Sequence, residues 1–261
     1  MTDHTRPDGA PAWVDLSTSD PEGARTFYGD LFGWTITDQG EEYGHYHLIH
    51  AGDALVGGLM STVGMTCPEG GEVPTSWDVY LQTSDIEATT AAARSAGAKV
   101  IVEPMPVGPR GSMAVVVDPA GAAVGLWQPG EVGGMDLPLR PGTAVWFECM
   151  TLDFDAAEPF YRDVMSWDVS RMDADWKYST HGAEETAYAG LGDARGVFAD
   201  GVPSHWRVYL ATDDLTRDLA RMDELGAEIV DGPVDSPYGP LATIRDPQGA
   251  TFQLLQPSFT G

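Results

Sequence analysis

Cysteine and basic residues are scarce in this chain of 261 residues. It has two cysteines, Cys67 and Cys149, and fourteen lysines and arginines against forty aspartates and glutamates. Two cysteines are too few for a disulfide framework or a cysteine-rich zinc site. The formal charge of −26 at pH 7 repels phosphate groups and anionic lipid headgroups, so we expect neither nucleic acid nor a membrane surface as a partner.

Long apolar runs are also lacking. No stretch approaches the roughly 20 apolar residues that a helix needs to span a bilayer, and residues 1–11 have no apolar segment of a secretory signal. We therefore expect a soluble, cytoplasmic protein. The hydrophobic share of 43% is that of an ordinary globular chain, which has room for one large domain or two of about 130 residues.

The chain repeats itself with a constant offset of 133 residues. W-V-D-L-S-T-S-D begins at Trp13 and W-F-E-C-M-T-L-D at Trp146, and the F-Y segments that follow end at Trp34 and Trp167 (146 − 13 and 167 − 34). Later, D-P-x-G-A occurs at 118–122 and again at 246–250. Self-similarity at nearly fixed spacing indicates two homologous halves, joined by a linker rich in glycine and proline.

Each half divides again into two β-α-β-β-β units. In the first unit, alternating apolar residues predict strands at 13–17, 34–37, 43–50 and 54–61. Asp20 and Pro21 predict the start of a helix that ends near Gly33. The second unit predicts strands at 77–83, 99–103, 112–118 and 123–128, with a helix between Asp85 and Gly97. The Asp-Pro-x-Gly segments predict turns between the last two strands.

Three histidines lie close together at 45, 47 and 50. On the predicted strand 43–50, Tyr43, His45 and His47 share one face. The equivalent segment of the other half, 176–180, has no histidine. A solvated surface strand is therefore favoured over a metal or proton-transfer role.

Four such units, with the F-Y-x-x-x-x-G-W helix end and the D-P-x-G-A turn, resemble the vicinal oxygen chelate superfamily. This superfamily includes glyoxalase I, extradiol dioxygenases and the bleomycin and fosfomycin resistance proteins, and the chain looks most like its tandem two-domain glyoxalase-like "hydroxylase" type of actinobacteria. The resemblance implies an α+β fold with curled mixed sheets that form concave pockets, called cups below. It also implies a tail at 1–11, a first domain at 12–130, a linker at 131–142 and a second domain at 143–258. The motifs specify the fold better than the reaction.

The resemblance also locates the positions where relatives hold a metal. In those relatives, a histidine or glutamine on the first strand of a unit and a glutamate on its last strand bind one divalent ion. Here the first-strand positions carry Trp13, Asp78, Trp146 and Arg207, and last-strand positions carry Gly125 and Gln253. Indole has no lone pair for a metal, and Asp78 and Gln253 belong to different halves. We therefore expect no metal and no other cofactor.

Strand alternation assigns the side chains that would line the cups instead. The expected ligand-binding residues are Trp13, Asp78, Tyr80, Trp127, Trp146, Arg207, Tyr209 and Gln253. Large aromatic faces with a few polar groups suit a flat or polycyclic organic molecule. The same aromatic residues are also compatible with a filled core, and Arg207 with a structural ion pair to Asp78 or Glu148.

Glu148 and Asp15 fall on the same strand faces and are the candidate catalytic residues, each as a general acid or base. Two functions stay open on this basis. One is a metal-free protein that sequesters or carries an aromatic metabolite or antibiotic, as resistance proteins do. The other is a metal-independent enzyme of secondary metabolism, of a lyase, isomerase or hydroxylase-like kind, with an aromatic or polyketide-type substrate.

A metal-dependent glyoxalase, dioxygenase or hydroxylase with unusual ligands is the alternative to both. In every case the expected partner is a small molecule, and a homodimer is compatible with the sequence.

Overall fold

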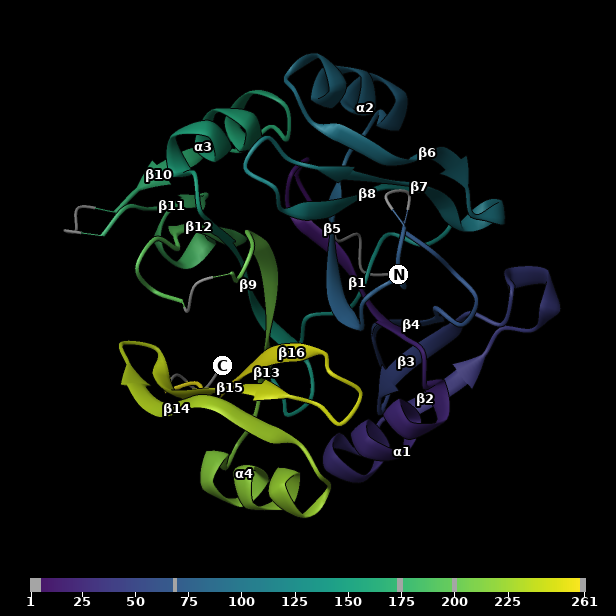
Figure 1. Ribbon diagram of the computed structural model, residues 1–261, viewed down its shortest axis with the longest axis vertical. Coiled ribbons are helices and arrows are strands. Elements are labelled where there is room, and N and C mark those ends of the chain that lie inside the picture. The colour runs from purple at the N-terminus through teal and green to yellow at the C-terminus, as the bar shows by residue number, and fades with distance from the viewer. Residues whose placement is uncertain (1–5, 68–69, 173–175, 199–200, 259–261) are drawn as a thin grey trace. The chain divides into compact units, whose positions relative to one another are not determined.

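The computed structural model describes residues 6–67, 70–172, 176–198 and 201–258. Within them the chain forms four successive modules, each made of one strand, one helix and three further strands (Figure 1). The predicted α+β class and the four β-α-β-β-β units are thus confirmed. No helix among these residues combines the length and apolar character that crossing a membrane requires.

The helices and strands of the four modules have these bounds. Module 1 contains β1 (Pro11–Thr18), α1 (Pro21–Phe32), β2 (Thr35–Asp38), β3 (His47–Ala51) and β4 (Ala54–Ser61). Module 2 contains β5 (Ser76–Gln82), α2 (Ile86–Ser95), β6 (Lys99–Pro106), β7 (Gly111–Val117) and β8 (Ala123–Pro129). Module 3 contains β9 (Ala144–Thr151), α3 (Phe154–Asp163), β10 (Val169–Arg171), β11 (Tyr178–His181) and β12 (Ala189–Asp193). Module 4 contains β13 (His205–Ala211), α4 (Leu215–Glu224), β14 (Glu228–Ser236), β15 (Gly239–Arg245) and β16 (Thr251–Leu255).

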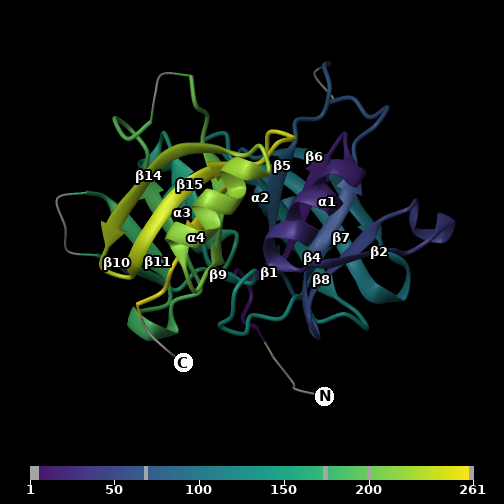
Figure 2. The same cartoon turned by 90° about the horizontal axis from the view of Figure 1, so that it is seen from below.

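The strands form two eight-stranded mixed sheets of matching topology. Their orders are β2-β3-β4-β1-β5-β8-β7-β6 and β10-β11-β12-β9-β13-β16-β15-β14. In each module the first strand runs parallel to the last, and the remaining pairs are antiparallel. Each helix packs on strands of its own module, as Figure 2 shows for α4 on β14.

The four α-helices of the described residues all begin with an aspartate cap. An aspartate at the N-cap accepts a hydrogen bond from the backbone N–H three residues later, as Asp153 does from Ala156 at 3.1 Å. Asp20 and Asp85 cap α1 and α2 as predicted, and Asp214 caps α4. Helix α1 ends at Gly33, whose φ of 68° lies in the left-handed region that glycine tolerates.

The predicted strand at 43–50 is wrong in its first part. Residues Glu41–Tyr43 form a 3-10 turn, and His45 has a φ of 58°. A strand requires negative φ throughout, so β3 begins only at His47. Tyr43, His45 and His47 therefore do not share a strand face.

The chain divides into two compact units that interleave along the sequence. Unit 1 consists of Met1–Trp13, Asp78–Gly134 and Phe147–Arg207, and unit 2 of Val14–Trp77, Met135–Trp146 and Val208–Gly261. Unit 1 thus holds most of modules 2 and 3, whereas unit 2 holds most of modules 1 and 4.

A buried hydrogen-bond chain ties the two modules of unit 1 together. The Tyr161 hydroxyl of α3 donates to Asp118 Oδ2 at 2.9 Å, and the Trp206 indole donates to the Tyr161 oxygen at 3.0 Å. The other carboxylate oxygen of Asp118 accepts the backbone N–H groups of Ala120 and Ala122, which closes the Asp-Pro-x-Gly turn of module 2. One aspartate therefore both shapes its own turn and holds the helix of the next module.

Unit 2 repeats this chain with its own modules. Tyr28 of α1 donates to Asp246 at 2.9 Å, Trp77 donates to the Tyr28 hydroxyl at 3.0 Å, and Asp246 closes the turn between β15 and β16. Burial raises the pKa of Asp118 and Asp246, and it raises the pKa of Tyr161 and Tyr28 well above their usual value. Both tyrosines therefore stay protonated donors.

The segment around Gly9 is held by module 3. The indole of Trp167 donates to the Gly9 carbonyl at 3.0 Å and stacks on the His181 ring. His181 Nδ1 accepts the backbone N–H of Asp168 at 3.0 Å, and its Nε2 lies 3.1 Å from the Asp8 carbonyl. This arrangement requires neutral His181, whose pKa burial lowers.

We expect Tyr161→Phe to lower the free energy of unfolding by about 1–3 kcal/mol, because Asp118 Oδ2 and the Trp206 indole N–H then lose the buried hydroxyl to which they are hydrogen-bonded. Urea denaturation followed by circular dichroism measures the change. Tyr238→Phe is the control, since the Tyr238 side chain is exposed. Equal stability of the two variants would contradict the assigned role of the Tyr161 hydroxyl.

Stability should also fall as the pH drops below about 6.5, the ordinary pKa of histidine in an unfolded chain. The folded pKa of His181 is lower, so the unfolded state binds more protons between these two values, and stability is lost as pH falls through this window. The free energy of unfolding of His181→Phe should be about 1–3 kcal/mol lower than that of the wild type near neutral pH. It should also decline less than that of the wild type as the pH falls to about 5.5. If the urea concentration at the unfolding midpoint falls with pH as steeply in His181→Phe as in the wild type, the role assigned to His181 is refuted.

Candidate functional site

The candidate site is built on the inner face of module 3, defined here as the face of β9, β11 and β12 that points away from α3. Glu148 lies in β9 and is in register with Gly190 of β12. The Tyr178 hydroxyl of β11 donates to Glu148 Oε1 at 2.8 Å. The carboxylate side chain is only 9% exposed, so the tyrosine supplies polar contact that water supplies elsewhere.

Two glycines of β12 make room for this contact. A Cβ atom on Gly190 would overlap the Tyr178 hydroxyl. A Cβ atom on Gly192 would lie 2.8 Å from the Trp176 ring and 3.0 Å from Met150 Sδ. The alternating glycines therefore leave a trough on the strand into which Tyr178 and Trp176 fit.

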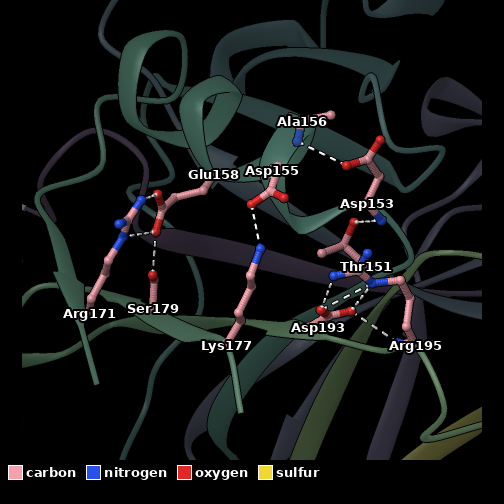
Figure 3. Close-up of polar contacts among 10 residues, drawn as sticks. All are labelled: Thr151, Asp153, Asp155, Ala156, Glu158, Arg171, Lys177, Ser179, Asp193 and Arg195. Atoms are coloured by element: carbon pink, nitrogen blue, oxygen red, sulfur yellow. Dashed lines mark hydrogen bonds and ion pairs between the residues drawn. The ribbon is translucent and has the colours of Figure 1, made fainter. Parts of the chain in front are cut away.

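The neighbours of Tyr178 fix the direction in which it points. Lys177 pairs with Asp155 at 2.6 Å, and the Ser179 hydroxyl donates to Glu158 at 2.6 Å; both acids belong to α3 (Figure 3). Because successive residues of a strand point to opposite faces, Tyr178 is directed at the inner face. Arg171 also hydrogen-bonds Glu158 and holds the pKa of this carboxyl below its usual value.

Trp176 adds an accessible aromatic surface. Its ring stacks on Tyr178 with centroids 5.0 Å apart and an interplanar angle of 30°. The indole N–H donates to the Asp193 carbonyl at 2.6 Å, which fixes the ring. Trp176 is 41% exposed, so a flat molecule can stack on it.

Arg207 of β13 is the cation of the site. Its Nη1 lies 3.7 Å from Glu148 Oε2, and its guanidinium carbon lies 4.3 Å from the centroid of the Phe198 ring. Its Nε points at His205 Nε2 at 3.4 Å. The Arg207 side chain is only 15% exposed. The structure thus places Arg207 beside Glu148, as the sequence allowed.

His205 presents an acceptor to Arg207. Its Nδ1 lies 2.8 Å from the Pro203 carbonyl, to which it donates when neutral. Burial and the adjacent guanidinium lower the pKa of His205, so the ring is neutral near neutral pH and its Nε2 can accept.

A similar pair occurs in module 1. The Tyr46 hydroxyl hydrogen-bonds Asp15, and Asp15 is in register with Gly58, where a Cβ atom would overlap that hydroxyl. Asp15, Tyr46 and Gly58 correspond to Glu148, Tyr178 and Gly190 at offsets of 133, 132 and 132 residues. The carboxylate–tyrosine–glycine arrangement is therefore repeated in both halves.

The remaining predicted ligand-binding residues lie on β1, β5, β8, β9, β13 and β16. Trp13 and Trp127 stack with ring centroids 6.4 Å apart, and Tyr80 lies over Gly125. Tyr209 is in register with Gln253, which accepts a hydrogen bond from Thr243. Asp78 and Trp146 are half-buried in β5 and β9.

The donor set does not fit a divalent ion. In the part of the chain that the structure describes, no three histidine, cysteine, aspartate or glutamate side chains lie close enough to hold one. Arg207 occupies a position where the resemblance expects a ligand, and its guanidinium faces the nearby carboxylate. A positive group there repels a cation.

A separate pocket of about 230 Å³ lies between α4 and the β14–β15 hairpin, within unit 2. It is lined by leucine, proline and valine side chains, with Asp235 and Gln256 among its polar groups. It is smaller than the roughly 300–1,000 Å³ typical of ligand sites and holds no aromatic residue.

Sequence reasoning missed Tyr178, Trp176 and Phe198. A tryptophan and a tyrosine two residues apart, with alternating glycines at 190 and 192 in the same unit, were the available signal. It becomes readable only when β11 and β12 are known to be neighbours.

Family models match both halves of the chain. Residues 10–126 match the model described as "Glyoxalase/Bleomycin resistance protein/Dioxygenase superfamily", and residues 145–255 match the model described as "Glyoxalase-like domain". The two halves are therefore tandem glyoxalase-like domains.

Two kinds of full-length relative are similar. The "Putative glyoxylase CFP32" of Mycobacterium tuberculosis is 33% identical over 254 residues, which cover 96% of this chain and 95% of the relative. The "Anthracycline biosynthesis protein DauV" of Streptomyces sp. (strain C5) is 32% identical over 260 residues, which cover 95% and 93%.

Solved structures share the fold at low identity. The Mn(II)-bound glyoxalase from Novosphingobium aromaticivorans has a TM-score of 0.63 at 17% identity, covering 95% of this chain and 82% of that one. The 2,3-dioxygenase LapB from Pseudomonas sp. KL28 has a TM-score of 0.65 at 11% identity, covering 96% and 92%.

We expect Gly190→Ala to lower the free energy of unfolding by about 1–3 kcal/mol, because the added methyl group displaces the Tyr178 hydroxyl from Glu148. In a Tyr178→Ala background the same change should cost much less, because the overlapping group is gone. Gly29→Ala is the control, since its Cβ would meet only ordinary contacts. If urea denaturation shows that Gly190→Ala lowers the free energy of unfolding equally in both backgrounds, Gly190 does not make room for Tyr178.

Proposed function

Since this chain belongs to the glyoxalase, bleomycin resistance protein and dioxygenase superfamily, we propose that it binds a small planar aromatic molecule on the inner face of module 3 and does so without a metal. The ligand stacks on Trp176, and its polar edge meets Glu148, Tyr178 and Arg207. The observation that carries the proposal is the buried Glu148 carboxylate, held by Tyr178 beside Arg207 and bordered by an exposed indole.

The chemistry of the site supports such a ligand. A stacked indole and phenol offer a flat apolar surface, and the carboxylate, hydroxyl and guanidinium offer directed polar contacts at one edge. Relatives of this chain are named anthracycline biosynthesis proteins, and anthracyclines are fused-ring aromatic compounds with phenolic hydroxyl groups. This ligand class therefore suits both the site and the relatives.

Glu148 is the proposed general base of the site. Its carboxylate can accept a proton from a bound ligand, and the Tyr178 hydroxyl keeps it oriented toward the inner face. Sequestration of an aromatic metabolite or antibiotic and metal-independent proton transfer share the binding step and differ only in the fate of the bound molecule. Asp15 with Tyr46 would serve the same purpose in the first half.

Quenching of tryptophan fluorescence by 1,8-dihydroxyanthraquinone tests the binding step. We expect saturable quenching by the wild-type protein and about tenfold weaker affinity in Trp176→Leu, which corresponds to about 1.4 kcal/mol. Tyr188→Leu is the matched control, because Tyr188 is 42% exposed and packs on His181 instead. If none of the aromatic compound classes tested quenches tryptophan fluorescence, the proposal is overturned.

Metal analysis provides the second arm of this experiment. Protein purified without chelators should contain far less than one zinc, manganese, iron or nickel ion per chain and should bind the probe equally well after chelator treatment. One tightly bound ion per chain, required for quenching, would favour the metal-dependent alternative.

A further inference from the structure

We propose that the site of module 3 selects ligands with an acidic phenol or enol hydroxyl and binds them in ionised form, with Arg207 as the group that receives the oxyanion. This inference rests on the proposed binding function. It adds the chemical class and charge state of the ligand.

The first observation concerns the donors of Arg207. Its Nε is directed at His205, while among the described residues no acceptor makes a hydrogen bond to Nη1 or Nη2. The distance of 3.7 Å from Nη1 to Glu148 exceeds the roughly 2.7–3.2 Å of a direct hydrogen bond. A guanidinium that is 15% exposed thus keeps its two terminal nitrogens for another acceptor.

The second observation concerns how the guanidinium is held. Phe198 lies against one face at 4.3 Å, and the Phe198 ring in turn lies 5.4 Å from the His205 ring. A cation fixed against an aromatic face loses little conformational freedom when it binds an anion. His205 and Phe198 are therefore positioning residues for Arg207.

The third observation concerns the proton. Glu148 already stands opposite Arg207, so the site holds one positive and one negative charge. A bound phenol can pass its hydroxyl proton to Glu148 Oε2, which becomes a neutral carboxylic acid, while the phenolate oxygen accepts N–H groups of Arg207. Net charge is conserved, because the O–H bond of the ligand breaks as that of the acid forms.

Three other ionisable side chains of unit 1 near this pair have different roles. Tyr178 contacts Glu148 as a donor, and neutral His205 contacts Arg207. Glu158 belongs to α3 on the opposite side of β11 and is paired with Arg171. A carboxylate ligand would satisfy Arg207 equally well but would bring no proton for Glu148.

The test uses alizarin, 1,2-dihydroxyanthraquinone, whose visible absorbance reports whether its phenol is ionised. Bound to the wild-type protein, alizarin should ionise at least about one pH unit lower than in solution, a tenfold change in its ionisation constant. Arg207→Met should abolish this shift, and Arg207→Lys should restore part of it. Arg245→Met, at a surface arginine paired with Glu228, should leave it intact.

Glu148→Gln separates the two roles in the site. Removing the carboxylate removes the group that takes the proton of the ligand, so the downward shift of the ionisation pH should be smaller in this variant than in the wild type, while Arg207 still produces part of it. A comparison with 1,2-dimethoxyanthraquinone, which has no hydroxyl to ionise, uses the wild-type protein alone. Above the pH at which alizarin ionises, the wild-type protein should bind alizarin at least about tenfold more tightly than it binds the dimethoxy compound.

The outcomes distinguish this inference from the function beneath it. If neither compound quenches tryptophan fluorescence, the proposed binding function fails. If alizarin binds but its ionisation is unshifted, or is shifted equally in Arg207→Met, the binding function stands and the inference is overturned.

Discussion

The hydrogen bond from a buried helix tyrosine to a turn aspartate is the constraint on which each unit depends. Tyr161 reaches Asp118 across 43 residues of sequence, and Tyr28 reaches Asp246 across 218. Each aspartate closes its own turn and is desolvated, which raises its pKa, so the tyrosine hydroxyl compensates for lost hydration. In unit 1 this bond fixes α3, and α3 in turn fixes β11 through Glu158 and Ser179.

Local patterns predicted the elements but not these long-range partners. Alternation, aspartate caps and Asp-Pro-x-Gly turns located the helices and most strands, since these features depend on residues close in sequence. The motif tyrosines and aspartates were recognised as repeated, yet nothing in their spacing says that a helix of one module binds the turn of another. The start of β3 was misplaced because apolar alternation does not reveal the left-handed conformation of His45.

The site was predicted in part for a similar reason. Alternation along β9 and β13 placed Glu148 and Arg207 on one face, and their proximity results from the pairing of first strands. The position of the Tyr178 hydroxyl depends on Gly190 of the neighbouring strand, because any side chain at residue 190 would overlap it. The sequence does not show which side chain Gly190 makes room for until the register of β11 and β12 is known.

The two halves retain the same carboxylate–tyrosine–glycine arrangement, so this arrangement alone does not distinguish them. Their difference lies in the residues at equivalent first-strand positions, Asp78 in module 2 and Arg207 in module 4. A second carboxylate favours a cation or a neutral hydrogen-bond donor, whereas a guanidinium favours an oxyanion. Positions that hold a metal in relatives thus carry charges of opposite sign here. A fixed arginine supplies positive charge without the exchangeable coordination of a metal, so it stabilises an oxyanion through N–H hydrogen bonds and not through metal–oxygen bonds.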